Sequence, residues 1–293
     1  MIRRTRKGKT MKTLLAFSGG LDSSYILWKL LTETTEEVTV FYQNNSNIDQ
    51  DLFTEDDASK SSMIWAVLEE YRKIRPFQYV EYFTRPDELH PQLKHRNLLV
   101  IIQNYKKIND GTYDKLVFGS SYEDRHIKVV PHLDWTPTYY AERRLFKHVC
   151  TRGELSYPLC DGTWHKNYTK AYAMLNLPDE YKNLILSCNK PIYDETRPNK
   201  ARNCETCKRC LLNRKYEEML TSGYTPAQIL KWRFDKNLEY GGGKLMAAPH
   251  FWIATEMGIP GAPSKKEVIE TFRKEGHFNL KGLKNANLWK DLL

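Results

Sequence analysis

The sequence predicts a doubly wound α/β fold, a parallel sheet covered by helices on both faces, over residues 11–186. Two observations predict it. Strand-like and helix-like segments alternate along this part of the chain, and a glycine pair directly follows the first strand-like segment. The rest of the chain has a different pattern, with clustered cysteines in a small segment at 187–222 and a helical C-terminal extension at 223–293. Residues 1–10 are expected to form a basic flexible tail.

The elements of the first half follow in order from local composition. Runs of apolar, β-branched and aromatic residues predict strands at Lys12–Phe17, Val38–Gln43, Gln78–Phe83 and Lys115–Gly119. Apolar residues near helical spacing predict intervening helices at Tyr25–Leu31, Thr54–Ile74 and Asn97–Ile108. This alternation requires parallel strands joined by crossover helices. Much farther along, Thr225 and Gln228 have the spacing of a capping box, which predicts another helix start.

The charge of the chain is concentrated at its beginning. The net charge of the 293 residues is +9, but five basic residues lie within the first ten, so the rest carries only +4. This modest charge does not by itself indicate a nucleic-acid-binding surface. The longest aliphatic run, Leu98–Ile102, is too short to cross a bilayer. With no signal peptide recognised either, we expect a soluble protein of the cytoplasm with no membrane partner.

The segment Ser18–Ser24, with the sequence SGGLDSS, lies between a predicted strand and a helix start. Glycines let backbone amides approach an anion closely, and the first turn of a helix presents free N–H groups. Asp22 does not suit a pure phosphate site unless it binds a metal or orients a group. The segment lacks both the Gly-Lys-Ser/Thr ending of a Walker loop and the dinucleotide-binding glycine spacing. An ordinary serine-capped turn is the alternative interpretation.

This heptapeptide resembles the S-G-G-x-D-S signature of the ATP pyrophosphatase (PP-loop) family. The resemblance implies a Rossmann-like sheet, bound ATP and Mg²⁺, and transfer of AMP to an oxygen of the acceptor with release of pyrophosphate. It assigns contact with phosphate and metal to the whole loop, and catalytic roles to two of its members, Asp22 and Ser23. The loop residues are Ser18, Gly19, Gly20, Leu21, Asp22, Ser23 and Ser24.

Four cysteines have the spacing of a metal site. Cys188 is followed after fifteen residues by Cys204, Cys207 and Cys210, which are separated by two residues each. Four thiolates form a closed tetrahedral site for Zn²⁺, which favours a structural zinc ion. An iron–sulfur cluster also suits this spacing. Disulfides are the remaining alternative, which an intracellular location disfavours.

The cysteine segment resembles that of the 7-cyano-7-deazaguanine synthases, whose pattern is S-C, a spacer, then C-G-x-C-x-x-C-x-x-x-R. Glu205 stands where that pattern has Gly. Weaker similarities lie between the two motifs and cover most of residues 11–216: His95-Arg96-Asn97, Phe118-Gly119-Ser120 to Asp124, and Pro158-Leu159 to Lys166. Residues 131–134 are the nearest counterpart of the base-reading segment, and the chain beyond about residue 223 has no recognised counterpart.

The resemblance implies ATP-dependent conversion of 7-carboxy-7-deazaguanine and ammonia to 7-cyano-7-deazaguanine through an adenylated intermediate, by a carbon–nitrogen ligase of queuosine biosynthesis. Arg96 and Lys166 are then expected to contact phosphate or the intermediate, with a solvated surface cation as the alternative for each. Asp124 and Asp134 are expected to recognise the base. Relatives in this family commonly form homodimers.

Three alternatives stay open. A divergent member stops at the amide or joins the deazapurine to an amine of a macromolecule, and the C-terminal extension motivates this alternative. A second is a PP-loop enzyme that modifies tRNA, which the basic tail and Lys231-Trp232-Arg233 favour. The third is a nucleotide-binding module without activity, which an intact Asp22 disfavours.

Overall fold

The computed structural model describes residues 10–44, 60–83, 96–121, 137–159, 169–188, 191–199, 201–229 and 232. For residues 60, 96, 137–141 and 208 it describes the backbone alone. Several predicted features lie outside these ranges, namely the basic tail up to residue 9, Asp124, Asp134, Lys166, and the extension beyond residue 232.

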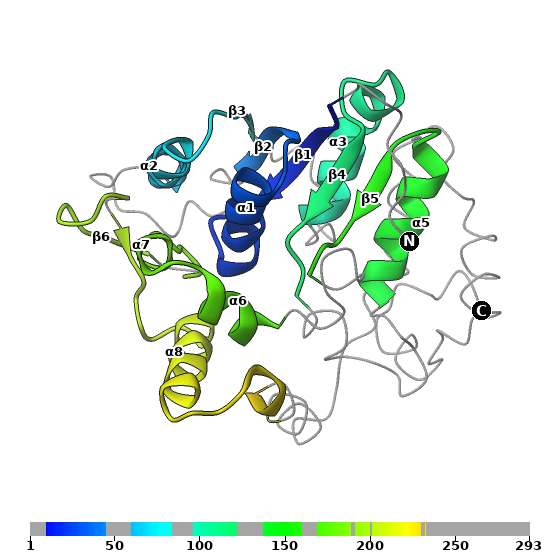
Figure 1. Ribbon diagram of the computed structural model, residues 1–293. Helices are drawn as coiled ribbons and strands as arrows, with labels where there is room; N and C mark the ends of the chain where they lie inside the picture. Colours follow the sequence, from blue (N-terminus) through cyan, green and yellow to red (C-terminus); the bar gives the residue numbers. More distant parts are fainter. Residues whose placement is uncertain are drawn as a thin grey trace, which may run out of the picture. The chain divides into compact units, whose positions relative to one another are not determined.

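Five strands form one parallel sheet in the order β3-β2-β1-β4-β5 (Figure 1). They are β1 (Lys12–Phe17), β2 (Glu37–Asn44), β3 (Gln78–Phe83), β4 (Lys115–Phe118) and β5 (Glu154–Ser156). All four pairings are parallel, and β1 pairs with β2 from Lys12↔Glu37 to Phe17↔Tyr42. The predicted α/β class with a parallel sheet is therefore confirmed.

The strand order changes direction at β1. The chain runs outward through β2 to β3, then returns to place β4 on the other side of β1. The carboxyl ends of β1 and β4 consequently flank a topological switch point, where α/β sheets usually bind ligands. The segment Ser18–Ser24 begins directly at this point.

The helices of the sheet region lie in successive layers. Helix α1 (Leu21–Glu33) contacts both β1 and α6 (Lys170–Asn176), and α6 contacts α8 (Lys208–Thr221). Because α1 is covered on two sides, most of its residues are buried, including Tyr25, Ile26 and Leu27. This layering brings the first residues of α1 and α6 together although they are far apart in sequence.

The same region contains four more elements in the described part of the chain. They are α2 (Lys60–Arg72), α7 (Asp179–Lys182), and a two-stranded antiparallel ribbon of β6 (Ile192–Tyr193) and β7 (Ala201–Arg202). The predicted capping box is confirmed: the Gln228 backbone N–H donates to Thr225 Oγ1, and the Thr225 N–H donates to Gln228 Oε1.

The chain divides into two compact units. One contains the whole sheet, α1, α2 and the cysteine segment, so residues 187–222 belong with the sheet. The other contains most of α3 (Arg96–Asn109) and all of α5 (Pro137–Val149). Within this second unit, Asn97 Nδ2 donates to Glu142 Oε1 at 2.9 Å, which joins the two helices.

None of the helices in the described ranges has the length and apolar character needed to span a membrane.

Candidate functional site

The loop between β1 and α1 depends on its two glycines. Gly19 has a φ of +75°, and a Cβ at this position would lie 2.5 Å from Ile64 Cδ1. Gly20 is the N-cap of α1 and has extended backbone. The loop therefore turns sharply and places the N-terminus of a 13-residue helix at the carboxyl end of β1. This is the local geometry that favours anions.

Two serines brace the loop from within. Ser23 Oγ donates to the Gly20 carbonyl at 3.1 Å and accepts from the Ser18 backbone N–H at 3.3 Å. The hydroxyls of Ser18 and Ser23 lie 3.2 Å apart. Ser18 is exposed, whereas Ser23 is buried. Ser18 is therefore the better placed of the two to reach a ligand with its hydroxyl, while Ser23 holds the loop in shape.

Leu21 and Ser24 belong to the interior. Both side chains are buried, and the Ser24 N–H donates to the Gly20 carbonyl. The Ser24 hydroxyl faces Tyr71, and burial raises the pKa of Tyr71 well above its ordinary value. The side chains of these two predicted loop residues therefore pack inside the protein and do not reach a ligand at the loop.

Gly119, directly after β4, lies against the loop from the other side of the switch point. A Cβ at Gly119 would lie 2.9 Å from the Ser23 backbone nitrogen and 3.0 Å from its Cα. Both are main-chain atoms, which cannot move aside as the end of a side chain can. The glycine therefore allows the end of β4 to approach the first turn of α1.

The most informative contact of the loop is an ion pair that the sequence did not predict. Lys170 Nζ lies 2.5 Å from Asp22 Oδ2, and the side chains are 19% and 14% exposed. Lys170 is the first residue of α6, whose N-cap Thr169 accepts a hydrogen bond from the Tyr172 N–H at 3.0 Å. The site thus combines a helix N-terminus, a carboxylate and an ammonium group, which suits a phosphate ester with a bound cation.

The other predicted residues are placed less completely. Arg96 begins α3, but its side chain is not described. Asp124, Asp134 and Lys166 lie outside the described residues. Lys170, four residues after Lys166, is the lysine found at the loop. Only a Thr-Lys pair at a helix start could have indicated it, and that signal is weak.

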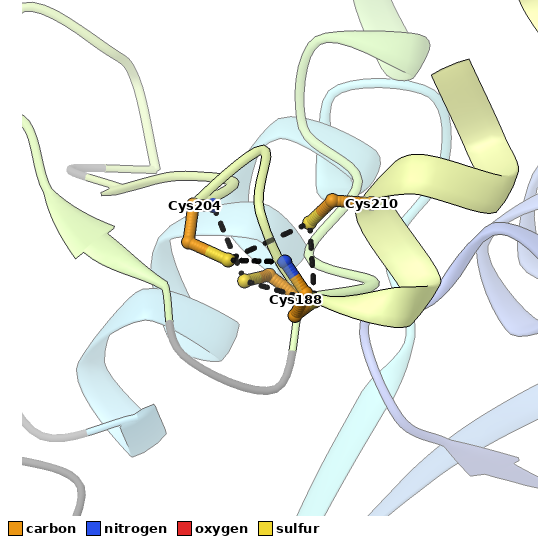
Figure 2. Close-up of side chains that lie close together, drawn as sticks. Cys188, Cys204 and Cys210 are labelled. Carbon is orange, nitrogen blue, oxygen red and sulfur yellow. Dashed lines mark hydrogen bonds between the residues drawn. The ribbon is translucent and has the colours of Figure 1, made fainter. Parts of the chain in front are cut away.

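The four predicted cysteines come together at one point. Their sulfur atoms all lie within 4.8 Å of one another, and Figure 2 shows Cys188, Cys204 and Cys210 directed toward a common centre. The Sγ–Sγ distances are 3.9 Å for Cys188–Cys207, 3.9 Å for Cys204–Cys210 and 3.4 Å for Cys207–Cys210. Thiolates at about 2.3 Å from one tetrahedral ion lie about 3.8 Å apart. The four thiols could therefore hold one metal ion such as zinc.

The surroundings of the four thiols shift their pKa values in different directions. Hydrogen bonds, first from the Thr206 hydroxyl and then from Cys188 and backbone N–H groups, lower the pKa of Cys204 to about 5. Burial, and then contact with Cys207 and Cys188, raises the pKa of Cys210. None of the five described cysteines forms a disulfide bond. A cation at the centre would favour the thiolate form of all four ligands.

Glu205 has a φ of +61°, in the left-handed region that favours glycine. It stands where the synthase pattern has Gly, so the backbone conformation suits that pattern even though the side chain differs. The tight turn lets the Cys207 N–H donate to Cys204 Sγ at 3.3 Å.

No protein family model matches this chain, and no curated protein matches it significantly.

Proposed function

We propose that this protein is an ATP-dependent enzyme of the PP-loop type that adenylates a carboxylic acid. The observation that carries the proposal is the Asp22–Lys170 pair beside a glycine turn at the switch point of a parallel sheet. The heptapeptide Ser18–Ser24 supports ATP as the ligand of this turn, because it resembles the PP-loop signature.

The proposed acceptor is 7-carboxy-7-deazaguanine, since the cysteine segment resembles that of the 7-cyano-7-deazaguanine synthases. A carboxylate oxygen attacks the α-phosphorus of ATP, and pyrophosphate leaves. Ammonia then attacks the acyl carbon, AMP leaves, and the product is the amide. The amide oxygen then attacks the α-phosphorus of a second ATP and pyrophosphate leaves. The amide nitrogen loses its two protons, the oxygen leaves with AMP, and the nitrile remains.

The residues of the loop have separate tasks in this scheme. The N-terminus of α1 and the exposed Ser18 hydroxyl hold phosphate oxygens, while Lys170 offsets the charge that develops as pyrophosphate leaves. Asp22 is the residue that would hold Mg²⁺, which neutralises phosphate charge when bound. Because Asp22 pairs with Lys170, this requires the ammonium group to shift toward phosphate.

The decisive experiment is the product mass. The full chain is incubated with 7-carboxy-7-deazaguanine, ATP, Mg²⁺ and ammonium, and nucleotides and deazapurines are identified by mass spectrometry. We expect the nitrile together with AMP and pyrophosphate. If only the amide forms, the enzyme stops at the amide. If a product forms only when a macromolecular amine is added, the enzyme joins the deazapurine to that amine. Absence of ATP consumption with every deazapurine acid would contradict the proposal.

We also propose that the cysteine site holds zinc rather than an iron–sulfur cluster. The short Sγ–Sγ distances support a single ion, because a cluster distributes its cysteines over several irons. With four thiolates the ion would be closed to substrate and therefore structural. Metal analysis of the purified protein should give one zinc per chain. Stoichiometric iron with visible absorbance would contradict this assignment.

A further inference from the structure

We call the Ser18–Ser24 loop the phosphate loop, after the ligand that we propose for it. The segment Leu184–Cys188 lies between this loop and the cysteine site, and we call it the bridging segment. It follows α7 and ends at the first metal-site cysteine. Leu184, Leu186 and Cys188 are buried, with 3%, 4% and 3% of their surface exposed. It is thus an interior connection whose position depends on the hydrogen bonds along its two edges.

One edge of the bridging segment bonds to the phosphate loop. The Leu186 N–H donates to the Gly19 carbonyl at 2.8 Å, and the Leu21 N–H donates to Ser187 Oγ at 3.3 Å. Leu21 begins α1, so its N–H has no acceptor within the helix. The Ser187 hydroxyl therefore fixes the first N–H of the helix end that we propose binds phosphate.

The other edge bonds to the residues around the metal site. The two side-chain amides Asn199 Nδ2 and Asn203 Nδ2 donate to the carbonyls of Leu184 and Ile185, each at 3.2 Å. Asn203 Oδ1 also accepts from the Cys188 N–H at 3.2 Å. The Cys204 N–H in turn donates to Cys188 Sγ at 3.2 Å. The chain that carries three of the metal ligands consequently holds the bridging segment in place.

We propose that Ser187 is a positioning residue, and that the metal site holds the phosphate loop in its binding conformation through the bridging segment. Occupancy of the cysteine site and binding of nucleotide are then positively coupled, although the metal touches no substrate. Coupling is reciprocal, so nucleotide must also slow the loss of metal. This second statement rests on the proposed function, because it takes ATP as the ligand of the loop.

Amide hydrogen exchange tests the coupling without nucleotide. The full chain is compared before and after metal removal with a chelator. The Leu21 and Leu186 amides should exchange about tenfold faster or more once the metal is gone. Amides of β1, such as that of Leu15, are the internal control and should keep their protection. Unchanged exchange at Leu21 and Leu186 after complete metal loss would overturn the proposal.

Substitution of Ser187 separates positioning from simple stability. Ser187→Ala should retain its metal and lose about three- to tenfold in ATP affinity, the value of one hydrogen bond. Ser187→Thr, which keeps the hydroxyl, should restore affinity. Ser222→Ala, at an exposed serine after α8, is the matched control and should bind ATP normally. Equal ATP affinity of Ser187→Ala and the unmodified protein would overturn the role of Ser187.

The rate of metal release completes the test. Saturating ATP should slow transfer of metal to a chromogenic chelator at least about threefold in the unmodified protein, and this effect should be lost in Ser187→Ala. If ATP binds but leaves the rate unchanged, the coupling is wrong while the proposed function stands. If ATP does not bind at all, the proposed function fails, and the exchange experiment still tests the link between metal and loop.

Discussion

The Ser18–Ser24 loop and the cysteine site are held together by different means. The loop is braced by its own hydrogen bonds, with the Ser23 hydroxyl between Ser18 and Gly20. The cysteine site instead gathers four ionisable thiols within 4.8 Å of one another. Thiolates at this distance repel each other unless a cation lies between them. The loop's internal bracing therefore needs no ligand, whereas the four cysteines could ionise together only with a cation between them.

Removal of one thiol should have the largest effect, because the proposed metal ion would lose one of its four ligands. Cys210→Ser should weaken zinc binding by at least about 100-fold, since structural sites derive their folding energy from the complete ligand set. Metal analysis after dialysis measures this. Cys150→Ser is the matched control, because Cys150 is buried outside the cluster. Full zinc retention in Cys210→Ser would contradict the four-cysteine site.

Asp22→Asn tests the chemistry of the loop while leaving its bracing intact. We expect ATP-to-AMP turnover with the acid substrate to fall about 10²- to 10³-fold, as for other groups that organise transition-state charge. Zinc content should not change. Asp179→Asn serves as the control, because Asp179 forms an exposed pair with Lys182 at 2.8 Å. Turnover as fast as that of the unmodified protein would remove Asp22 from the mechanism.

Gly19→Ala tests whether the loop conformation itself requires glycine. The φ of +75° and the overlap with Ile64 Cδ1 should together reduce the free energy of unfolding by about 2–4 kcal/mol. Gly223 has a similar φ of +82° in open space, so Gly223→Ala should lose only about 1–2 kcal/mol. Denaturant titration measures both. Equal losses would show that the packing around Gly19 adds nothing.

Lys170→Met removes the ammonium group but keeps the length of the side chain. ATP affinity should fall about tenfold, since one charge-assisted contact is lost. Lys182→Met removes a partly exposed lysine from its pair with the exposed Asp179 and should leave affinity unchanged. Isothermal titration with ATP distinguishes the two, and identical affinities would exclude Lys170 from the phosphate site.

The smallest expected effect is a gain in stability rather than a loss. Glu205→Gly relieves a left-handed residue with a φ of +61° and should stabilise the metal-bound protein by about 1 kcal/mol or less. Glu217→Gly, at an exposed position in the middle of α8, should destabilise the protein by about 1 kcal/mol. A loss of stability in Glu205→Gly would mean that the glutamate side chain contributes more than its backbone costs.

The sheet was predictable because its strands are dense in β-branched and aromatic residues. The predicted bounds of β1 and β3 are those observed, whereas α1 begins at Leu21 rather than Tyr25. The polar residues Asp22, Ser23 and Ser24 hid the first turn, because such residues usually favour turns over helix interiors. The three-residue strand β5 and the helix α5 were not predicted.

The candidate site was predictable only where its residues are close in sequence. The loop and three of the cysteines form compact motifs, and the four thiols do come together. Lys170 pairs with Asp22 across 148 residues, and no local pattern connects the two positions. Its place at the loop follows from the packing of α6 against α1, which periodicity does not specify.

The hydrogen bond between Leu21 and Ser187 spans 166 residues, and this separation bears on how the protein matures during translation. At about 5–20 residues per second, a ribosome needs on the order of ten seconds or more to make the stretch between them. The glycine turn leaves the exit tunnel early and acquires this partner only after residue 187 has been made as well. Nascent chains therefore complete the turn late. A truncated chain that ends before Ser187 contains the heptapeptide Ser18–Ser24 but lacks the hydrogen bond from Leu21 to Ser187.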